Sequence, residues 1–431
     1  MPLPPARSAM ICLGLCCVTA ALQAQSLTDV VRLALSQYPS LATAQARTDA
    51  ARADIARARS AHYPQISVGA GLNSYASGSV PSSLGRSSFS PSARINLWSG
   101  GRIEADAERA QALTQASEAQ QLLTQDDVAL QACEAYLSWV RGHDLLKLAE
   151  RNLESHQQTL DDIRKIAQVD TGRRIDLEQA QVRVDNARLA VQTRQTDLAV
   201  SAQRLRRFWT AALPAQAHAN EPVDLADTPL GVMPASLDDA LSRVDDTLPA
   251  LVPLRAQVAA AQAAVRQAQG LYWPTVDLAS SRQFNTNTLR FETLTQLQLN
   301  MPVYNGQATS AQIDSALAQL RVAEANLEEA RLQQKEKVVQ AWEEWQSAQG
   351  RARMGASQSE VGEKVVEGYR QQFRLARRSL LDLLNIQADS FNYRNAAKTA
   401  FHDERIARAR LLTTLGELAR RFEAPTPGEV R

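Results

Sequence analysis

The sequence has few residues of the kinds that interrupt helices or form cross-links. Glycine occurs 18 times and proline 17 times in 431 residues, and aromatic residues make up 5%. Three of the four cysteines (Cys12, Cys16 and Cys17) lie near the start, so Cys133 alone remains beyond them, which excludes an internal disulfide and a cysteine zinc site there. Alanine, glutamine, leucine, arginine and glutamate fill the long middle stretches, a composition typical of long helices and coiled coils.

Neither the net charge nor the side-chain motifs indicate a nucleic-acid partner or a catalytic activity. The formal net charge is +1, so no strong field for a polyanion is expected. No phosphate-binding glycine loop or nucleophile elbow is present. We therefore predict no catalytic, cofactor or metal site and no nucleic-acid partner. The histidines are scattered without metal-ligand spacing: His62, His143, His156, His218 and His402.

The first 24 residues read as a secretory signal peptide. Arg7 supplies a positive start, residues 10–22 are apolar, and Leu22-Gln23-Ala24 suits cleavage. A buried N-terminal helix is the alternative. Leu15 precedes Cys16 where a lipoprotein signal needs a small residue, so no lipid anchor is predicted. Beyond this segment no apolar run reaches the roughly 18 residues of a membrane-spanning helix, so a membrane crossing would have to use strands.

The chain contains the same pattern twice. Ser26-Leu27-Thr28-Asp29 leads to Tyr63-Pro64, and 210 positions later Ser236-Leu237-Asp238-Asp239 leads to Trp273-Pro274. Further on the offset is 206, where Leu97-Trp98-Ser99-Gly100 matches Val303-Tyr304-Asn305-Gly306. Such a long duplication indicates two similar structural halves.

Each half is predicted to be a helix, two strands and a long antiparallel helical hairpin, which makes the fold mainly α with membrane β. We expect the signal peptide at 1–24, a linker at 213–235 and a flexible tail at 424–431. The first repeat would span 25–212, with strands at about 65–75 and 89–98 and a hairpin at about 102–212. The second would span 236–423, with strands at about 275–283 and 293–303 and a hairpin at about 308–422.

Apolar and polar residues alternate along most of the predicted strands, which are about ten residues long, the length a tilted strand needs to cross a bilayer. The 275–283 strand alternates poorly and is inferred from the repeat. An edge of a soluble sandwich is the alternative reading. Aromatic residues at the strand ends would lie at the lipid headgroup level: Tyr63, Trp98, Trp273 and Tyr304.

Four strands cannot close a barrel, and open strand edges cannot face lipid because their backbone groups would be unsatisfied. Neighbouring copies must therefore complete the sheet. Two copies would give eight strands around a filled interior, and three would give twelve around a hollow one. The hairpins hanging from this barrel would form a helical tube.

These features resemble the TolC family of outer-membrane efflux and secretion channels. The resemblance rests on the duplication, the Tyr-Pro strand starts, the Leu-Trp-Ser-Gly-Gly strand end and residues 372–385. It implies a homotrimer in outer-membrane lipid that extends into the periplasm, with a twelve-stranded barrel and a helical tunnel. It also implies two partners, a periplasmic adaptor and an inner-membrane ABC or proton-driven transporter. The 372–385 stretch favours the type I protein secretion branch, while drug or metal efflux and a soluble periplasmic coiled-coil scaffold are the alternatives.

The resemblance also implies a gate where the helical hairpins turn. Asp176 of the first hairpin would pair with Arg378 of the second, and Asp382 would belong to an acidic ring. Phe373 replaces a bridging tyrosine, so one polar link would be missing, and Asn385 replaces a second ring acid. The alternative is that Asp176 and Arg378 only cap and solvate helix ends. The predicted partner contacts at the hairpin tips are Gly172, Arg173, Arg174, Arg377 and Ser379.

Overall fold

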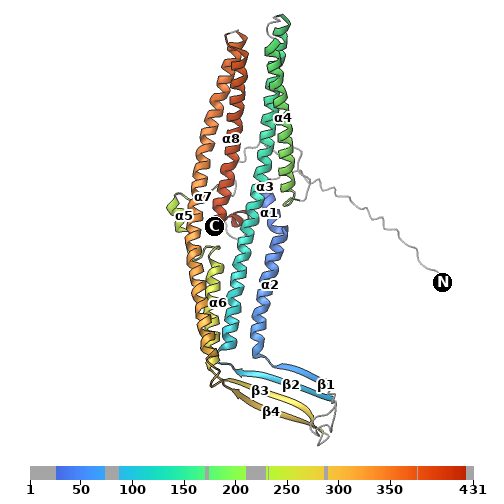
Figure 1. Cartoon of the computed structure of the whole chain (residues 1–431), viewed down its shortest axis with the longest axis vertical. Coiled ribbons are helices and arrows are strands. Elements are labelled where there is room, and N and C mark those ends of the chain that lie inside the picture. Colours follow the sequence, from blue (N-terminus) through green and yellow to red (C-terminus); the bar gives the residue numbers. More distant parts are fainter. Residues whose placement is uncertain are drawn as a thin grey trace, which may run out of the picture.

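The computed structural model describes residues 26–72, 87–169, 174–209, 230–231, 233–285, 290–375 and 377–423. Its main feature is a pair of very long helices. Helices α3 (Arg102–Val169) and α7 (Ala308–Arg374) have 68 and 67 residues, which at 1.5 Å per residue is roughly 100 Å each. They run the length of the molecule from a β-sheet at one end to two helical hairpin turns at the other (Figure 1). We call the hairpin-turn end the tip.

The two repeats contain the same elements in the same order. The first comprises α1 (Leu27–Gln37), α2 (Pro39–Arg59), the 3-10 turn η1 (Ser60–His62), β1 (Gln65–Leu72), β2 (Ser87–Trp98), α3 and α4 (Arg174–Leu205). The second comprises α5 (Leu237–Ser242), α6 (Val252–Gln269), η3 (Gly270–Tyr272), β3 (Thr275–Asn285), β4 (Arg290–Asn300), α7 and α8 (Leu380–Thr414), followed by the short α9 (Leu418–Phe422).

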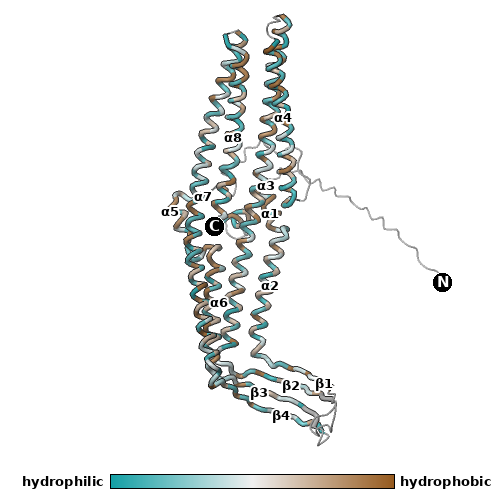
Figure 2. Tube along the Cα trace, viewed as in Figure 1, coloured by the Kyte–Doolittle hydropathy of each residue, from teal (hydrophilic) through white to brown (hydrophobic). Residues whose placement is uncertain are grey.

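Shorter helices cover both halves of each long helix. α4 and α8 return from the tip along α3 and α7, while α2 and α6 cover the halves nearer the sheet (Figure 1). Hydrophobic and hydrophilic residues alternate along the long helices, as a narrow packing stripe requires (Figure 2). No helix in the described ranges is both long and apolar enough to cross a membrane.

Local signals in the sequence set several helix ends. Ser26 and Ser379 each cap a helix, and in both cases an aspartate three residues later completes a capping box. α8 ends at Thr414 because Gly416 adopts φ 66°, a left-handed conformation that glycine tolerates best. The return helix predicted to continue to about residue 422 is therefore shorter than expected.

The strands form one antiparallel sheet in the order β1-β2-β3-β4. The β2–β3 pairing joins the two repeats, with Ile95 opposite Leu278. The last strand was predicted at about 293–303, but β4 runs from Arg290 to Asn300. Pro302 explains this correction, since proline has no N–H to donate to a strand ladder.

The buried core lies in the helical region. Its largest cluster brings α1, α3, α8 and α9 together and includes Cys133, whose side chain is fully buried. A second cluster packs α5 against α7 and α8 around Trp342 and Trp345. The predicted signal peptide, the tail and residues 213–229 of the predicted linker lie outside the described residues.

Candidate functional site

The sheet separates an apolar face from a polar face. Its register places one set of alternating residues on a common face: Ile66, Val68, Ala70, Phe89, Pro91, Ala93, Ile95, Val276, Leu278, Leu297 and Leu299. The opposite face carries Gln65, Ser67, Gly69, Ser90, Ser92, Arg94, Asn96, Thr275, Asp277, Gln296, Gln298 and Asn300. Several apolar side chains are strongly exposed in the single chain, with Ile66 79% and Leu299 68% accessible. This is the surface of a sheet that faces lipid on one side and water on the other.

Several residues depart from the pattern toward the far end of the sheet. Leu294 lies on the polar face, and the apolar face carries Ser280, Arg282, Thr293 and Thr295. The Arg282 guanidinium lies 5.1 Å from the centre of the Phe291 ring. An arginine at that edge can reach the headgroup region with its charged end.

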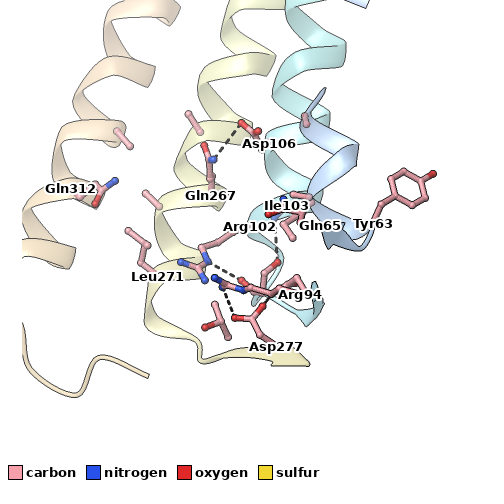
Figure 3. A pocket seen from close by; sticks show the side chains of 18 of the residues that line it. Tyr63, Gln65, Arg94, Arg102, Ile103, Asp106, Gln267, Leu271, Asp277 and Gln312 are labelled. Atoms are coloured by element: carbon pink, nitrogen blue, oxygen red, sulfur yellow. Dashed lines mark hydrogen bonds and ion pairs between the residues drawn. The ribbon is translucent and has the colours of Figure 1, made fainter. Parts of the chain in front are cut away.

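The four predicted interface aromatics all lie where the sheet meets the helices. Trp98 ends β2 and Trp273 precedes β3, and their rings contact edge to face with centroids 6.1 Å apart. Tyr63 precedes β1 and Tyr304 follows β4, and their side chains are mostly exposed. Figure 3 shows Tyr63 directed away from the neighbouring polar residues. Their role at the membrane interface remains a prediction.

A polar cavity of about 750 Å³ lies at this junction (Figure 3). Residues of the polar strand face line it, together with the sheet-facing ends of α3, α6 and α7. Arg94 bonds Asp277 at 2.6 Å, and the Asn96 amide donates to the same carboxylate at 2.8 Å. The Asp277 side chain is only 6% exposed, so this link between β2 and β3 is largely shielded on its acidic side.

Polar contacts connect the first hairpin to the second along α3 and α8. Arg410 bonds Glu134 and Arg141 bonds Asp403, both at 2.8 Å. The buried His402 ring lies 3.0 Å from Asp144. Burial opposes ionisation of Asp144, but hydrogen bonding to His402 and the nearby charge of Lys398 outweigh it and lower the pKa of this carboxyl.

Another carboxylate connects α9 to α3. Asp126 accepts a 2.7 Å hydrogen bond from the backbone N–H of Ala419. Burial raises the pKa of Asp126 to about 6, despite that hydrogen bond and the nearby charge of Arg420. Arg32 of α1 donates to the Phe422 carbonyl at 2.9 Å, so α9 contacts elements of both repeats.

An apolar cluster joins the two hairpins close to the tip. Ile163 of α3 is fully buried with Phe373 of α7 and Leu380, Leu383 and Leu384 of α8. The Phe373 position, predicted to lack a polar link, is thus occupied by an aromatic ring in an apolar environment. Its contact with the other hairpin depends on packing rather than on a hydrogen bond.

The structure does not bring the predicted gate pair together within one chain. The Arg378 guanidinium lies 4.6 Å from the centre of the Tyr369 ring and donates to Gln372 at 3.1 Å. No hydrogen bond or ion pair joins it to Asp176 in the parts of the chain described. Asp382 accepts a hydrogen bond from the Ser379 N–H, and its own N–H donates to the Ser379 hydroxyl, so Asp382 completes the capping box at the start of α8.

The predicted tip contacts are placed only in part. Arg174, Arg377 and Ser379 are exposed at the hairpin turns. Gly172 and Arg173 lie outside the described residues. Partner contact at these positions remains a prediction.

Comparison with known proteins identifies the family. Residues 30–211 and 240–417 each match the model of the family described as outer membrane efflux protein. The chain belongs to this family. The two matched segments fall within the two repeats, so each repeat corresponds to one copy of the family unit.

Curated relatives carry names of the same kind. The chain is 24% identical to outer membrane efflux protein BepC of Brucella suis over 377 residues, covering 85% of this chain and 79% of that protein. It is 25% identical to protein CyaE of Bordetella pertussis over 338 residues, or 75% and 69% of the two chains. Probable efflux pump outer membrane protein TtgC of Pseudomonas putida is 24% identical over 315 residues, which cover 69% of this chain and 62% of that relative.

Solved outer-membrane channels share the fold. CusC aligns with a TM-score of 0.78 at 19% identity, covering 90% of this chain and 91% of the other. The open state of MtrE from Neisseria gonorrhoeae gives 0.76 at 18% identity and 92% and 91% coverage. The TolC-family resemblance and the predicted fold class are confirmed. The protein is an outer-membrane efflux channel by family, and both family and fold are those of channels rather than enzymes.

Sequence reasoning missed the charged residues at the junction. The available signal was a charged residue on the polar side of the strand alternation, Arg94 in the first repeat and Asp277 in the second, since charged residues in membrane segments face the interior and usually have a partner. The pairing of Arg94 with Asp277 could not be inferred from spacing because the two residues are 183 positions apart.

Proposed function

We propose that this protein is the passive exit duct of a tripartite export system. Three copies close a twelve-stranded barrel in the outer membrane and extend it as a helical tunnel into the periplasm. The observation that carries this proposal is the sheet of four strands with one apolar and one polar face. In the described chain β1 and β4 are its edges, and such edges can enter lipid only when neighbouring copies pair with them.

The tips are proposed to meet a periplasmic adaptor, with an inner-membrane transporter supplying the energy. Their exposed polar groups, among them Arg174 and Arg377, suit a reversible protein contact. Asp176 and Arg378 are proposed to link different subunits, because within one chain they do not meet. Such a partly exposed pair contributes only modest energy, which docking of a partner can overcome.

The cargo class has two candidates. The 372–385 stretch resembles the secretion branch and favours a protein exported by a type I system. Small-molecule efflux is favoured by relatives named antibiotic efflux pump outer membrane protein ArpC and toluene efflux pump outer membrane protein TtgC. A strain lacking the protein distinguishes them: loss of a secreted protein supports the first, and greater antibiotic or solvent sensitivity with unchanged secretion supports the second.

A pair of neighbouring substitutions tests the duct itself. Val68→Lys places a charge on the apolar face, where a charge within the bilayer costs about 2–4 kcal/mol at the midplane. Ser67→Lys places the same charge on the polar face one residue earlier. We expect only Val68→Lys to abolish heat-modifiable trimers in outer-membrane fractions. Equal assembly of both variants would contradict the proposed orientation of the sheet.

A further inference from the structure

The junction cavity lies on the water-filled side of the proposed barrel wall. Five of its lining residues belong to the start or end of the polar strand face: Gln65, Arg94, Asn96, Thr275 and Asp277. The opposite face of the same strands is the apolar one. In the proposed trimer, anything exported passes from the helical tunnel into the barrel at this level, so the cavity wall borders its route.

Most charges around this cavity are paired. Arg94 bonds Asp277 at 2.6 Å, and Arg109 bonds Asp106 at 2.8 Å. These two pairs account for both carboxylates that line the cavity. Each guanidinium therefore balances a carboxylate close to it, and neither pair gives the cavity a net charge.

Arg102 is the exception. It lines the same cavity, and among the residues described it forms no ion pair with a carboxylate. Its Nε donates to the Ser99 carbonyl at 3.0 Å, which leaves the other guanidinium donors available. In Figure 3 the side chains of Arg94, Arg102 and Asp277 converge on the same part of the cavity.

The fold holds the Arg102 side chain in place. A Cβ at Gly270 would lie 2.5 Å from the Arg102 Cγ, so only glycine at this position leaves room for the arginine stem. Gly270 belongs to the second repeat and Arg102 to the first. The stem is thus fixed between the repeats while the guanidinium faces the cavity.

We propose that Arg102 is a selectivity residue: with its two copies in the trimer it forms a positively charged collar at the barrel–tunnel junction. The collar attracts anionic groups of exported molecules, such as carboxylates, phosphates or sulfates. A guanidinium suits this role because it stays charged at all physiological pH values and bonds oxyanions with two parallel donors. This inference rests on the proposed trimeric duct.

The test is block of single-channel current by inorganic pyrophosphate added on the barrel side of a planar bilayer. From that side the anion reaches the junction without passing the tip. We expect voltage-dependent block of the parent channel, and for Arg102→Gln at least an approximately threefold higher pyrophosphate concentration for half block. Arg102→Lys keeps the charge and should stay close to the parent.

Arg331→Gln is the matched control, because it removes one positive charge beside Asp246, away from the cavity. Pyrophosphate should block this variant at the same concentration as it blocks the parent. Equal block of the parent and Arg102→Gln would overturn the collar, as would loss of block in Arg102→Lys and Arg102→Gln alike. A parent protein that forms no channel would instead contradict the proposed duct, so the two failures are distinguishable.

Discussion

Ile163 of α3 and Phe373 of α7 lie in one buried apolar cluster near the tip, so the two hairpins of a chain are joined there by packing. Ile163 is fully buried and Phe373 is 8% exposed. Apolar contacts of this kind have no directional bond, and much of their attraction is lost when the helices separate by about 1 Å. The packing of the two hairpins near the tip therefore depends on side-chain volume at these two positions.

Phe373→Ala should loosen the tip. Truncating a buried phenylalanine costs about 3–5 kcal/mol through lost burial and the cavity left behind. We expect single-channel conductance above that of the parent. Leu381→Ala is the control, because Leu381 lies on the neighbouring helix with half its surface exposed. Unchanged conductance in Phe373→Ala would show that the cluster does not hold the hairpins together.

Asp176→Ala and Arg378→Ala test the proposed link between subunits. Each should increase conductance, and the double variant should increase it no further than the larger single effect, since both remove the same contact. Tyr369→Leu removes the ring beneath Arg378 but keeps an apolar side chain against the Ile163–Phe373 cluster, so it serves as the comparison within one chain. If both alanine variants conduct like the parent, the residues only cap and solvate helix ends.

Arg94→Ala should destabilise the junction by removing the cation that is hydrogen-bonded to the shielded Asp277 carboxylate. Removing one partner of a buried pair costs about 3–5 kcal/mol, and the exposure of Arg94 places the expected value at or below the lower end. Trimers should dissociate at a lower temperature in gel-based melting. The double variant Arg94→Gln with Asp277→Asn should recover most of the lost melting temperature. If it does not, the charge pair is not what stabilises the contact between β2 and β3.

Asp126 gives the stability of the helical region a defined pH dependence. Its pKa of about 6 lies above the ordinary 3.8, so the folded state binds the proton more tightly than the unfolded state. The associated stability is present below about pH 4 and is lost as pH rises to about 6, by about 3 kcal/mol in total.

Asp126→Asn should remove this fall. Unfolding of the detergent-solubilised protein followed from pH 4 to 7 should show a flatter curve for the variant, with greater stability than the parent at pH 7. Asp161→Asn, at an exposed carboxylate of the same helix, should leave the parent curve unchanged. A parent whose stability rises between pH 4 and 6 by an amount that Asp126→Asn does not alter would contradict this assignment.

The sequence predicted the architecture because its strongest signals are local. Strand alternation and the near absence of glycine and proline over α3 are visible within short windows, and the duplication then assigns the same elements to both halves. The β3 strand was harder because Ser280 and Ser281 are similar small residues on opposite faces. Its register becomes evident only from its neighbours, β2 and β4.

The contacts between distant segments could not be predicted in this way. Asp126 and Ala419 are 293 positions apart, and the sequence pattern around one does not predict contact with the other. The family resemblance predicted that Arg378 pairs with Asp176. In the structure its guanidinium instead contacts its neighbours Tyr369 and Gln372. Pairing over such distances is decided by tertiary packing, which a single sequence does not display.

Single-channel recording of the purified protein in planar bilayers tests the central claim most directly. A trimeric duct predicts discrete conductance steps from a heat-modifiable trimer, and no such steps from Val68→Lys. A protein that stays monomeric in water and never conducts would contradict it.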